Sequence, residues 1–344
     1  MDSGVDGARA RPRIQPKDMI SSRFRRYLSC HAVSLVWISL LAFPLQSCII
    51  ARLDESPAVR MNYLYLLGRL LGICANPDRI VFNSLLDGDY EIYTISSDGT
   101  DLIQLTFDPQ VDSAPSWSPD GRQVVFQSNW AGTFGLYVID STGQNEKPLL
   151  VDGFINQHPV YSTDGQGIFF DSNRGGSSQD IYYLDLNTGF IAQITTSGGA
   201  YDNVAPAVSA GTEFIFFNTT SGGTDDIARI RKDGSGLAII VVDPNSDTEP
   251  AVAPDGSFIL FTSDRDGDQE IYRANIDGTS QTNLTNDPGN DSSAYLQPDG
   301  TGMVFASDRP LSDMEIYTGN LDGSGLSQLT SNSTLDTGPR WSCR

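Results

Sequence analysis

Residues 261–278 of this chain, FTSDRDGDQEIYRANIDG, hold the pattern that decides its fold. A short apolar run ends near Phe261 and a second is centred on Tyr272, with a polar segment around Gly267 between them. Short apolar runs separated by Asp, Asn and Gly residues are typical of β-hairpins, because glycine readily supplies the positive φ that tight turns need. We therefore expect two strands and a turn in this stretch.

The same pattern recurs along the chain. A phenylalanine in an apolar run marks each copy, at positions 82, 126, 170, 217, 261 and 305. Each copy contains further short runs, one of them near a proline, so a unit of about 45 residues offers four strands. Four antiparallel strands per unit indicate a propeller blade, and blades must pack radially to bury both faces. The sequence predicts an all-β, six-bladed β-propeller of four-stranded blades over residues 75–344.

The two ends of the repeat region complement each other. The first unit lacks an inner strand before Phe82, whereas GPRWSCR (338–344) resembles the inner-strand sequence APSWS (114–118). We predict that the C-terminal strand completes the first blade and closes the ring, which hides two open sheet edges. This closure brings Cys74 and Cys343 to the same turn, where in an exported protein they should form a disulfide; two free buried thiols are the alternative.

The N-terminal residues differ from the rest in charge and composition. The chain has a formal net charge of −21, but residues 1–47 hold seven Lys/Arg and three Asp/Glu. A basic RFRRY (23–27) precedes an apolar AVSLVWISLLAFPL (32–45), as in a signal segment. The following LQSC ends at Cys48 and resembles a bacterial lipobox. We predict a leader over 1–47, with Met19 as an alternative start, and a lipid on Cys48; a signal without a lipid or an uncleaved anchor is the alternative.

Residues 48–74 are interpreted as a linker. Ser56 and Pro57 suit the N-cap and first turn of a helix, and apolar residues recur at helical spacing up to residue 73. We therefore expect one short amphipathic helix between the leader and the propeller.

Two stretches carry a family resemblance. APSWSPDGRQVVFQS (114–128) and residues 261–278 resemble the WD40-like (PD40) repeats of the TolB β-propeller family. The resemblance covers residues 75–344, and the leader predicts an exported protein, periplasmic or at the cell surface. Family members include TolB itself, which binds the peptidoglycan-associated lipoprotein, and also propellers attached to prolyl peptidases or adapted as lyases. We expect this chain to correspond to the propeller domain of TolB alone, without its N-terminal α/β domain.

The aspartates of the opening stretch raise the question of a metal loop. An EF-hand loop carries a bidentate glutamate at its twelfth position, but Asn275 stands there if Asp264 is the first ligand. The triple aspartate is also missing from the other units. We interpret the loop as a solvated turn and expect no cofactor, with Ca²⁺ bound by Asp264, Asp266 and Asp268 as the alternative.

Polar residues recur three positions before the proline position of each inner strand. They are Asp112, Asn156, Asn203, Asp247, Asp291 and Asp336. Loops that enter the inner strands should surround the mouth of the central channel, so we expect a ring of carboxylates and amides there, with His158 at the same rim. Such a mouth would attract a cation or a basic peptide. Local turn hydrogen bonds are the alternative interpretation.

The hairpin that follows the second strand carries an arginine in three units, Arg174, Arg265 and Arg309. Trp130 takes the same position in another unit. We interpret the arginines as local turn contacts, and an exposed Trp130 would indicate a contact surface.

The acidic body excludes nucleic acid as a partner and limits membrane contact to the lipid anchor. His158 is the single histidine after the leader and no G-x-S-x-G motif is present, so we predict no enzyme and no catalytic residues. The prediction is a monomeric, exported, lipid-anchored binding module that presents an acidic channel mouth to a protein, peptide or glycan of the cell envelope. The alternative is a metal-assisted hydrolase or lyase that uses the carboxylate ring.

Overall fold

A computed structural model describes residues 74–309 and 313–343, and all of these residues belong to one compact unit. The predicted leader (1–47), the lipidation candidate Cys48 and the predicted helix (56–73) lie outside the described residues. Residues 74–309 and 313–343 contain no helix that could span a membrane.

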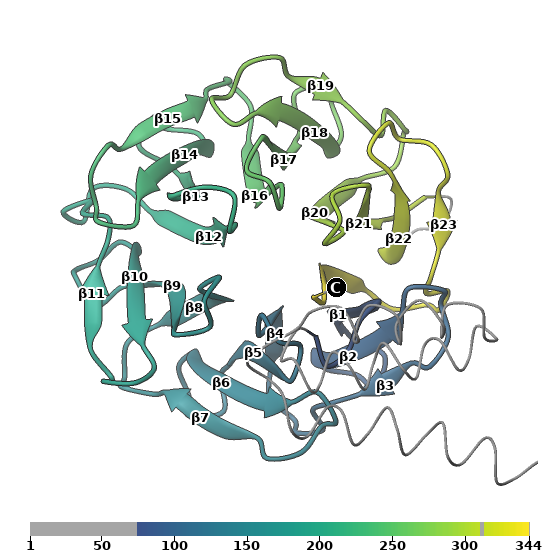
Figure 1. Cartoon of the computed structure of the whole chain (residues 1–344), viewed down its shortest axis with the longest axis horizontal. Helices are drawn as coiled ribbons and strands as arrows, with labels where there is room; N and C mark the ends of the chain where they lie inside the picture. The colour runs from purple at the N-terminus through teal and green to yellow at the C-terminus, as the bar shows by residue number, and fades with distance from the viewer. Residues whose placement is uncertain (1–73, 310–312, 344) are drawn as a thin grey trace, which may run out of the picture. The chain divides into compact units, whose positions relative to one another are not determined.

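Six four-stranded antiparallel sheets surround a central channel, as predicted (Figure 1). Listed from the innermost to the outermost strand, the first three blades are β24 (Asp336–Trp341), β1 (Arg79–Ser84), β2 (Glu91–Ser96) and β3 (Ile103–Gln104); β4 (Asp112–Trp117), β5 (Gln123–Ser128), β6 (Gly135–Asp140) and β7 (Lys147–Leu150); and β8 (Asn156–Tyr161), β9 (Gly167–Ser172), β10 (Asp180–Asp185) and β11 (Ile191–Gln193).

The other three blades have the same order. They are β12 (Asn203–Val208), β13 (Phe214–Thr219), β14 (Asp226–Arg231) and β15 (Ala238–Val241); β16 (Asp247–Val252), β17 (Phe258–Ser263), β18 (Glu270–Asn275) and β19 (Thr282–Asn283); and β20 (Asp291–Leu296), β21 (Gly302–Ser307), β22 (Glu315–Asn320) and β23 (Ser327–Gln328). We number the blades 1 to 6 in this order.

The repeated phenylalanines form the core. Each lies in the second strand of its blade, is at most 1% exposed, and in five blades stacks or tilts against a tyrosine of the third strand with ring centroids 5.7–6.0 Å apart. The apolar clusters span neighbouring blades; one, for example, joins Phe216 of β13 to Phe261 of β17. A single blade would leave these faces in water, so the ring is stabilised as a whole.

The closure of the ring is confirmed. Strand β24 pairs with β1 in antiparallel register, with Ile80 opposite Trp341 and Ser84 opposite Asp336. Figure 1 shows this last strand inside the first blade. Cys74 and Cys343 are disulfide-bonded with their Cα atoms 5.6 Å apart, so the chain ends of the propeller are joined covalently as well.

Candidate functional site

The six predicted ring residues occupy equivalent positions, because each is the first residue of an innermost strand. Each lies opposite a serine or threonine of the second strand, as Asp112 lies opposite Ser128 and Asp247 opposite Ser263. All six side chains are buried, and none is more than 3% exposed: Asp112, Asn156, Asn203, Asp247, Asp291 and Asp336. The structure therefore corrects the prediction of a carboxylate ring presented at the channel mouth.

Three of these residues are held by the hairpin arginines. Arg265 Nη2 lies 2.7 Å from Asp247 Oδ1, and Arg309 contacts Asp291 in the same way. In blade 3, Arg174 donates to Asn156 Oδ1 at 2.6 Å. The arginines therefore make more than local turn contacts, because each one bonds the residue that begins the innermost strand of its own blade.

Burial is the largest influence on the pKa of each ring carboxylate, and it raises that pKa. Burial raises the pKa of Asp247 although Ser263 and Arg265 lower it, and it raises the pKa of Asp291 in the same way. For Asp336, burial also raises the pKa, against hydrogen bonds that lower it. For Asp112 burial raises the pKa to about 7, and the charges of Asp108 and Glu146 add to this effect.

The innermost strands change register two residues after the ring positions. At each such place one residue has a positive φ, between 47° and 63°: Ala114, His158, Ala205, Glu249, Ser293 and Gly338. Each lies within the bulge of its own strand. Bulges re-aim side chains and are frequent near binding sites. Here four residues of this second set line the space between the innermost strands, whereas none of the six ring residues is among its lining residues.

A cavity of about 340 Å³ lies between the innermost strands, and Ala114, His158, Ala205 and Glu249 are among its lining residues. Four of the bulges are tied to the preceding blade, where a side chain of the second strand accepts the bulge N–H. For example, His158 N–H donates to Gln127 at 2.8 Å and Glu249 N–H to Asn218 at 3.0 Å. These bonds fix the channel wall across the blade boundaries.

The predicted rim residue His158 lies on this wall. Its Nδ1 is 2.8 Å from Oδ1 of Asp171, a fully buried carboxylate that also accepts the N–H of Ala205. Burial lowers the pKa of His158, but the charge of Asp171 and its hydrogen bond outweigh that effect, so the pKa is raised above its usual value. The imidazole therefore gains positive charge more readily than a free histidine does.

Two further charged groups line the cavity, Glu249 and Arg340. The carboxylate of Glu249 accepts bonds from the Ser293 hydroxyl at 2.8 Å and from the Thr262 hydroxyl at 3.1 Å. Arg340 lies over the ring of Tyr295 at 5.2 Å, and burial lowers its pKa. Neither residue belongs to the sites that the sequence predicts. Glu249 directly precedes Pro250, and Arg340 directly follows Pro339. The position next to an inner-strand proline could therefore have identified both residues from the sequence.

The opening hairpin is a turn held by its own carboxylates. Asp264 accepts the N–H of Ser246 at 2.8 Å, Asp266 accepts the hydroxyl of Tyr272, and Gly267 has a φ of 113°. Asp268 lies in the same turn. These contacts agree with the interpretation as a turn and leave the Ca²⁺ alternative at this loop without added support.

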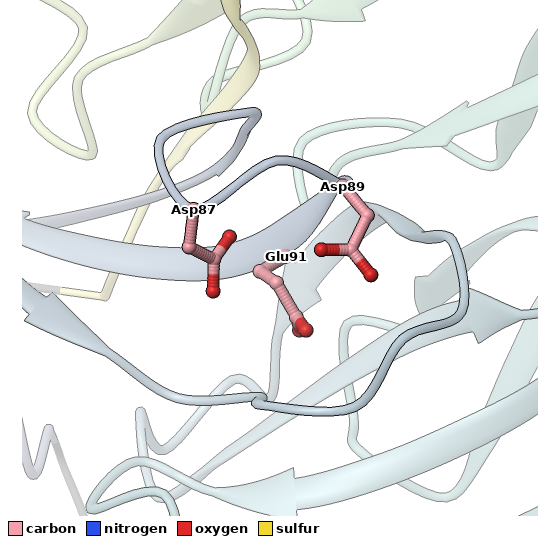
Figure 2. Close-up of side chains that lie close together, drawn as sticks. All are labelled: Asp87, Asp89 and Glu91. Atoms are coloured by element: carbon pink, nitrogen blue, oxygen red, sulfur yellow. The ribbon is translucent and has the colours of Figure 1, made fainter.

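Carboxylates converge elsewhere in the described part of the chain. Figure 2 shows Asp87, Asp89 and Glu91, which lie in and after the first hairpin of blade 1. Asp108, Asp112 and Glu146 form a second group in blade 2. Within each group the carboxylate oxygens lie within 4.8 Å of one another, and such oxygens are the ligands that hard divalent cations prefer.

Comparisons with known proteins agree with this architecture. The sequence matches the TolB beta propeller domain over residues 131–267 and 248–344. A comparison with curated proteins found no match. The crystal structure of TolB from Acinetobacter baumannii is similar with a TM-score of 0.67 and 20% identity, covering 84% of this chain and 73% of that one.

Two further solved structures illustrate the range of the fold. A putative TolB from Agrobacterium tumefaciens has a TM-score of 0.61 and 20% identity, over 76% of this chain and 91% of that one. An oligogalacturonate lyase from Vibrio parahaemolyticus has a TM-score of 0.52 and 18% identity, over 74% and 75%. At these identities the similarity concerns the fold alone. On the sequence match and the six closed blades, the chain belongs to the TolB β-propeller (PD40) family.

Proposed function

We propose that this protein is an exported binding propeller that receives a segment of a partner protein in its central channel. The observation that carries this proposal is the cavity of about 340 Å³ with Arg340 and His158 on its wall. Among the described residues, the hydrogen-bond partner of the Arg340 guanidinium is the carbonyl of Pro339, and no carboxylate forms an ion pair with it. A concave site with a few convergent polar groups suits a ligand.

The chemistry of the wall favours an acidic or hydroxyl-bearing segment. A guanidinium pairs strongly with carboxylates, and His158 becomes positively charged more readily than a free histidine. The nearby carboxylates of Glu249 and Asp171 already accept hydrogen bonds within the protein. The preference for a basic peptide that the sequence suggested is therefore replaced in this proposal, since the ring carboxylates behind it are buried.

Export and anchoring belong to the same proposal. A disulfide between Cys74 and Cys343 supports folding in an oxidising compartment, and membership of the TolB family supports the cell envelope. We propose that a lipid on Cys48 anchors a monomeric protein, periplasmic or at the cell surface. Replacing Cys48 with serine should release the protein from the membrane fraction, whereas membrane association unchanged by this substitution would contradict the anchor.

The enzymatic alternative has weaker support. A metal-assisted hydrolase or lyase would need its carboxylates in reach of the substrate, but the ring residues are at most 3% exposed. One similar structure is an oligogalacturonate lyase, at an identity that concerns the fold alone. We therefore favour the binding module.

The test is crosslinking in the cell envelope followed by purification of the full chain. The wild type and Arg231→Gln should recover the same partner, because Arg231 pairs with Glu213 on the outside of blade 4. Arg340→Gln should lose it. The pair Asp247→Asn and Asp291→Asn should keep it, since both side chains are buried. Equal recovery with Arg340→Gln would overturn the channel site, and recovery of polysaccharide instead of protein would make the partner a glycan.

A further inference from the structure

Blades 3, 5 and 6 share a charge arrangement that the fold repeats. An acidic residue stands four positions before the ring residue, and an arginine stands eighteen positions after it: Asp152, Asn156 and Arg174; Asp243, Asp247 and Arg265; Asp287, Asp291 and Arg309. The arginine contacts both partners in each case. In blade 3, for example, Arg174 Nη2 lies 3.1 Å from Asp152 Oδ2 and 2.6 Å from Asn156 Oδ1.

Blade 2 has acidic residues at both positions but no arginine at the third. Asp108 and Asp112 stand at the two acidic positions, and Trp130 stands where the arginine would be. The Trp130 ring stacks on Tyr137 with centroids 6.1 Å apart. In blade 5, the Arg265 guanidinium lies over the equivalent Tyr272 at 4.6 Å. The tryptophan therefore fills the place of the arginine beside the tyrosine without supplying its positive charge.

Glu146 adds a third carboxylate to this uncompensated pair. The oxygens of Asp108, Asp112 and Glu146 lie within 4.8 Å of one another. Asp112 is fully buried, and among the described residues neither of its carboxylate oxygens has a hydrogen-bond partner; Oε1 of Glu146 is also buried without one. A buried, unpartnered carboxylate costs free energy unless a cation or donor satisfies it.

The electrostatics agree with the geometry. Burial raises the pKa of Asp112 to about 7, and the charges of Asp108 and Glu146 add to this effect against the nearby hydroxyls of Ser128 and Thr106. Burial and Asp108 raise the pKa of Glu146 as well. A positive charge between these groups would reverse both effects.

From this arrangement we infer that Asp108, Asp112 and Glu146 bind a hard divalent cation of the Ca²⁺ class. In blade 2 the cation takes the part that the arginine takes in blades 3, 5 and 6. Three carboxylates supply oxygen ligands in one- or two-atom contacts, and water completes the shell of six to eight oxygens that Ca²⁺ requires. The site is structural, because it holds the start of β4 and the loop before β7 together.

The neighbouring group in Figure 2 has a different explanation. Glu91 begins β2, and the equivalent Asp180 and Glu270 of blades 3 and 5 are held by hydrogen bonds from loop residues, such as Ser197 N–H at 3.0 Å and Asp287 N–H at 2.8 Å. A carboxylate at this position is thus an ordinary part of several blades. Blade 1 also has no arginine at the equivalent position, where Leu86 stands, but there Asn332 donates to the ring residue Asp336 at 2.8 Å. Among the described residues, neither carboxylate oxygen of Asp112 in blade 2 has such a donor.

The experiment measures the thermal unfolding of the full chain with and without CaCl₂ after treatment with a chelator. A ligand that binds only the folded state raises its Tm, so CaCl₂ should raise the Tm of the wild type. Asp112→Asn and Glu146→Gln should each weaken Ca²⁺ binding about tenfold or more in calorimetric titration. MgCl₂ should act more weakly, because Mg²⁺ demands a tighter octahedral site.

The decisive variant is Trp130→Arg, which restores the arrangement of the other blades. It should raise the Tm in the absence of Ca²⁺ and abolish the further rise on adding CaCl₂. Trp130→Leu is the matched control, since it removes the ring without adding charge and should keep the response to Ca²⁺. The double variant Asp87→Asn and Asp89→Asn should also keep it.

Three outcomes would overturn the inference. The first is a wild-type Tm and calorimetric titration that CaCl₂ leaves unchanged. The second is a Ca²⁺ response that persists in Asp112→Asn, Glu146→Gln and Trp130→Arg. The third is a Ca²⁺ response that is lost only on replacing Asp87 and Asp89, which would place the site in blade 1. A response lost only on replacing Asp264, Asp266 and Asp268 would place it in the hairpin of blade 5.

Discussion

At the scale of single residues, the surroundings of a charged group decide its role more than its identity does. His158 and Asp171 lie 2.8 Å apart on the channel wall, and Arg265 and Asp247 lie 2.7 Å apart at the start of an innermost strand. In the first pair, His158 lines a cavity and can meet a ligand while Asp171 is buried behind it, whereas the second pair is largely buried and holds a hairpin to its own blade.

The first prediction concerns the pKa of His158. Its pKa is raised in the folded protein by Asp171, so the pair stabilises the fold fully below about pH 6.5, the unfolded value, and this contribution is lost as the pH rises through the folded pKa. Asp171→Asn should lower the pKa of His158. Proton NMR of the imidazole across the pH range measures this, with His158→Gln to assign the signal. A pKa unchanged by Asp171→Asn would contradict the account.

The second prediction concerns Arg265. Arg265→Met leaves Asp247 buried without its cation and should cost about 3 kcal/mol of unfolding free energy. Asp247→Asn should cost much less, because an asparagine already fills this position in blade 3, where Asn156 accepts from Arg174. Urea unfolding measures both. Arg231→Met, at a half-exposed surface pair, serves as the control. Equal losses for Arg265→Met and Arg231→Met would show that the buried pair has no special weight.

At the scale of elements, the bulge in each innermost strand does most to shape the channel. It places one residue per blade at a positive φ, and four of these residues, Ala114, His158, Ala205 and Glu249, line the cavity. Five of the six residues are not glycine, and L-residues pay about 1–2 kcal/mol for this conformation. The fold therefore accepts strain around the whole channel, and interblade hydrogen bonds such as that from Glu249 N–H to Asn218 help to hold it.

The third prediction tests this strain. Gly338 has a φ of 63°, and a Cβ there would come within 2.9 Å of Asn83 Oδ1. Gly338→Ala should therefore lower the unfolding free energy by about 1–2 kcal/mol. Ala205→Gly at the equivalent place should stay within about 1 kcal/mol of the wild type, because relief of strain offsets the greater entropy loss of glycine. Chemical denaturation measures both, and a Gly338→Ala variant as stable as wild type would refute the strain.

At the scale of the whole molecule, the closed ring makes stability a property of all six blades together. The apolar clusters cross the blade boundaries, and β24 joins the last residues of the chain to the first blade. An opened ring would expose two sheet edges and the apolar faces beside them. The strand pairing and the disulfide both oppose that opening.

The fourth prediction concerns this closure. The double variant Cys74→Ser and Cys343→Ser removes the bond across a sequence separation of 269 residues and should lower the unfolding free energy by roughly 2–5 kcal/mol. Denaturant unfolding of the variant should match that of the wild type under reducing conditions. A midpoint unaffected by both treatments would mean that strand pairing alone holds the ring closed.

Much of the fold could be predicted from the sequence repeat, but the residues of the candidate site could not. The spacing of the phenylalanines predicted six blades, and the tail around Trp341 predicted the closure and the disulfide partner of Cys74. The same alignment placed Asp112 and its equivalents at the channel mouth, because loops that enter the inner strands were expected to surround it. The bulges shift the pattern, so Glu249 and Arg340 face the cavity instead.

The sequence by itself determined the number of blades, their order and the strand that closes the ring, because apolar runs alternating with turn residues act locally and repeat. Tertiary structure alone decided which charges meet. Arg265 and Asp247 are eighteen positions apart and become partners only when their hairpin folds back on the blade. In blade 2 the same folding brings Trp130 to this place, and Trp130 supplies no charge to pair with Asp112. Electrostatic pairing depends on distance and burial, and neither can be read from a position in a repeat.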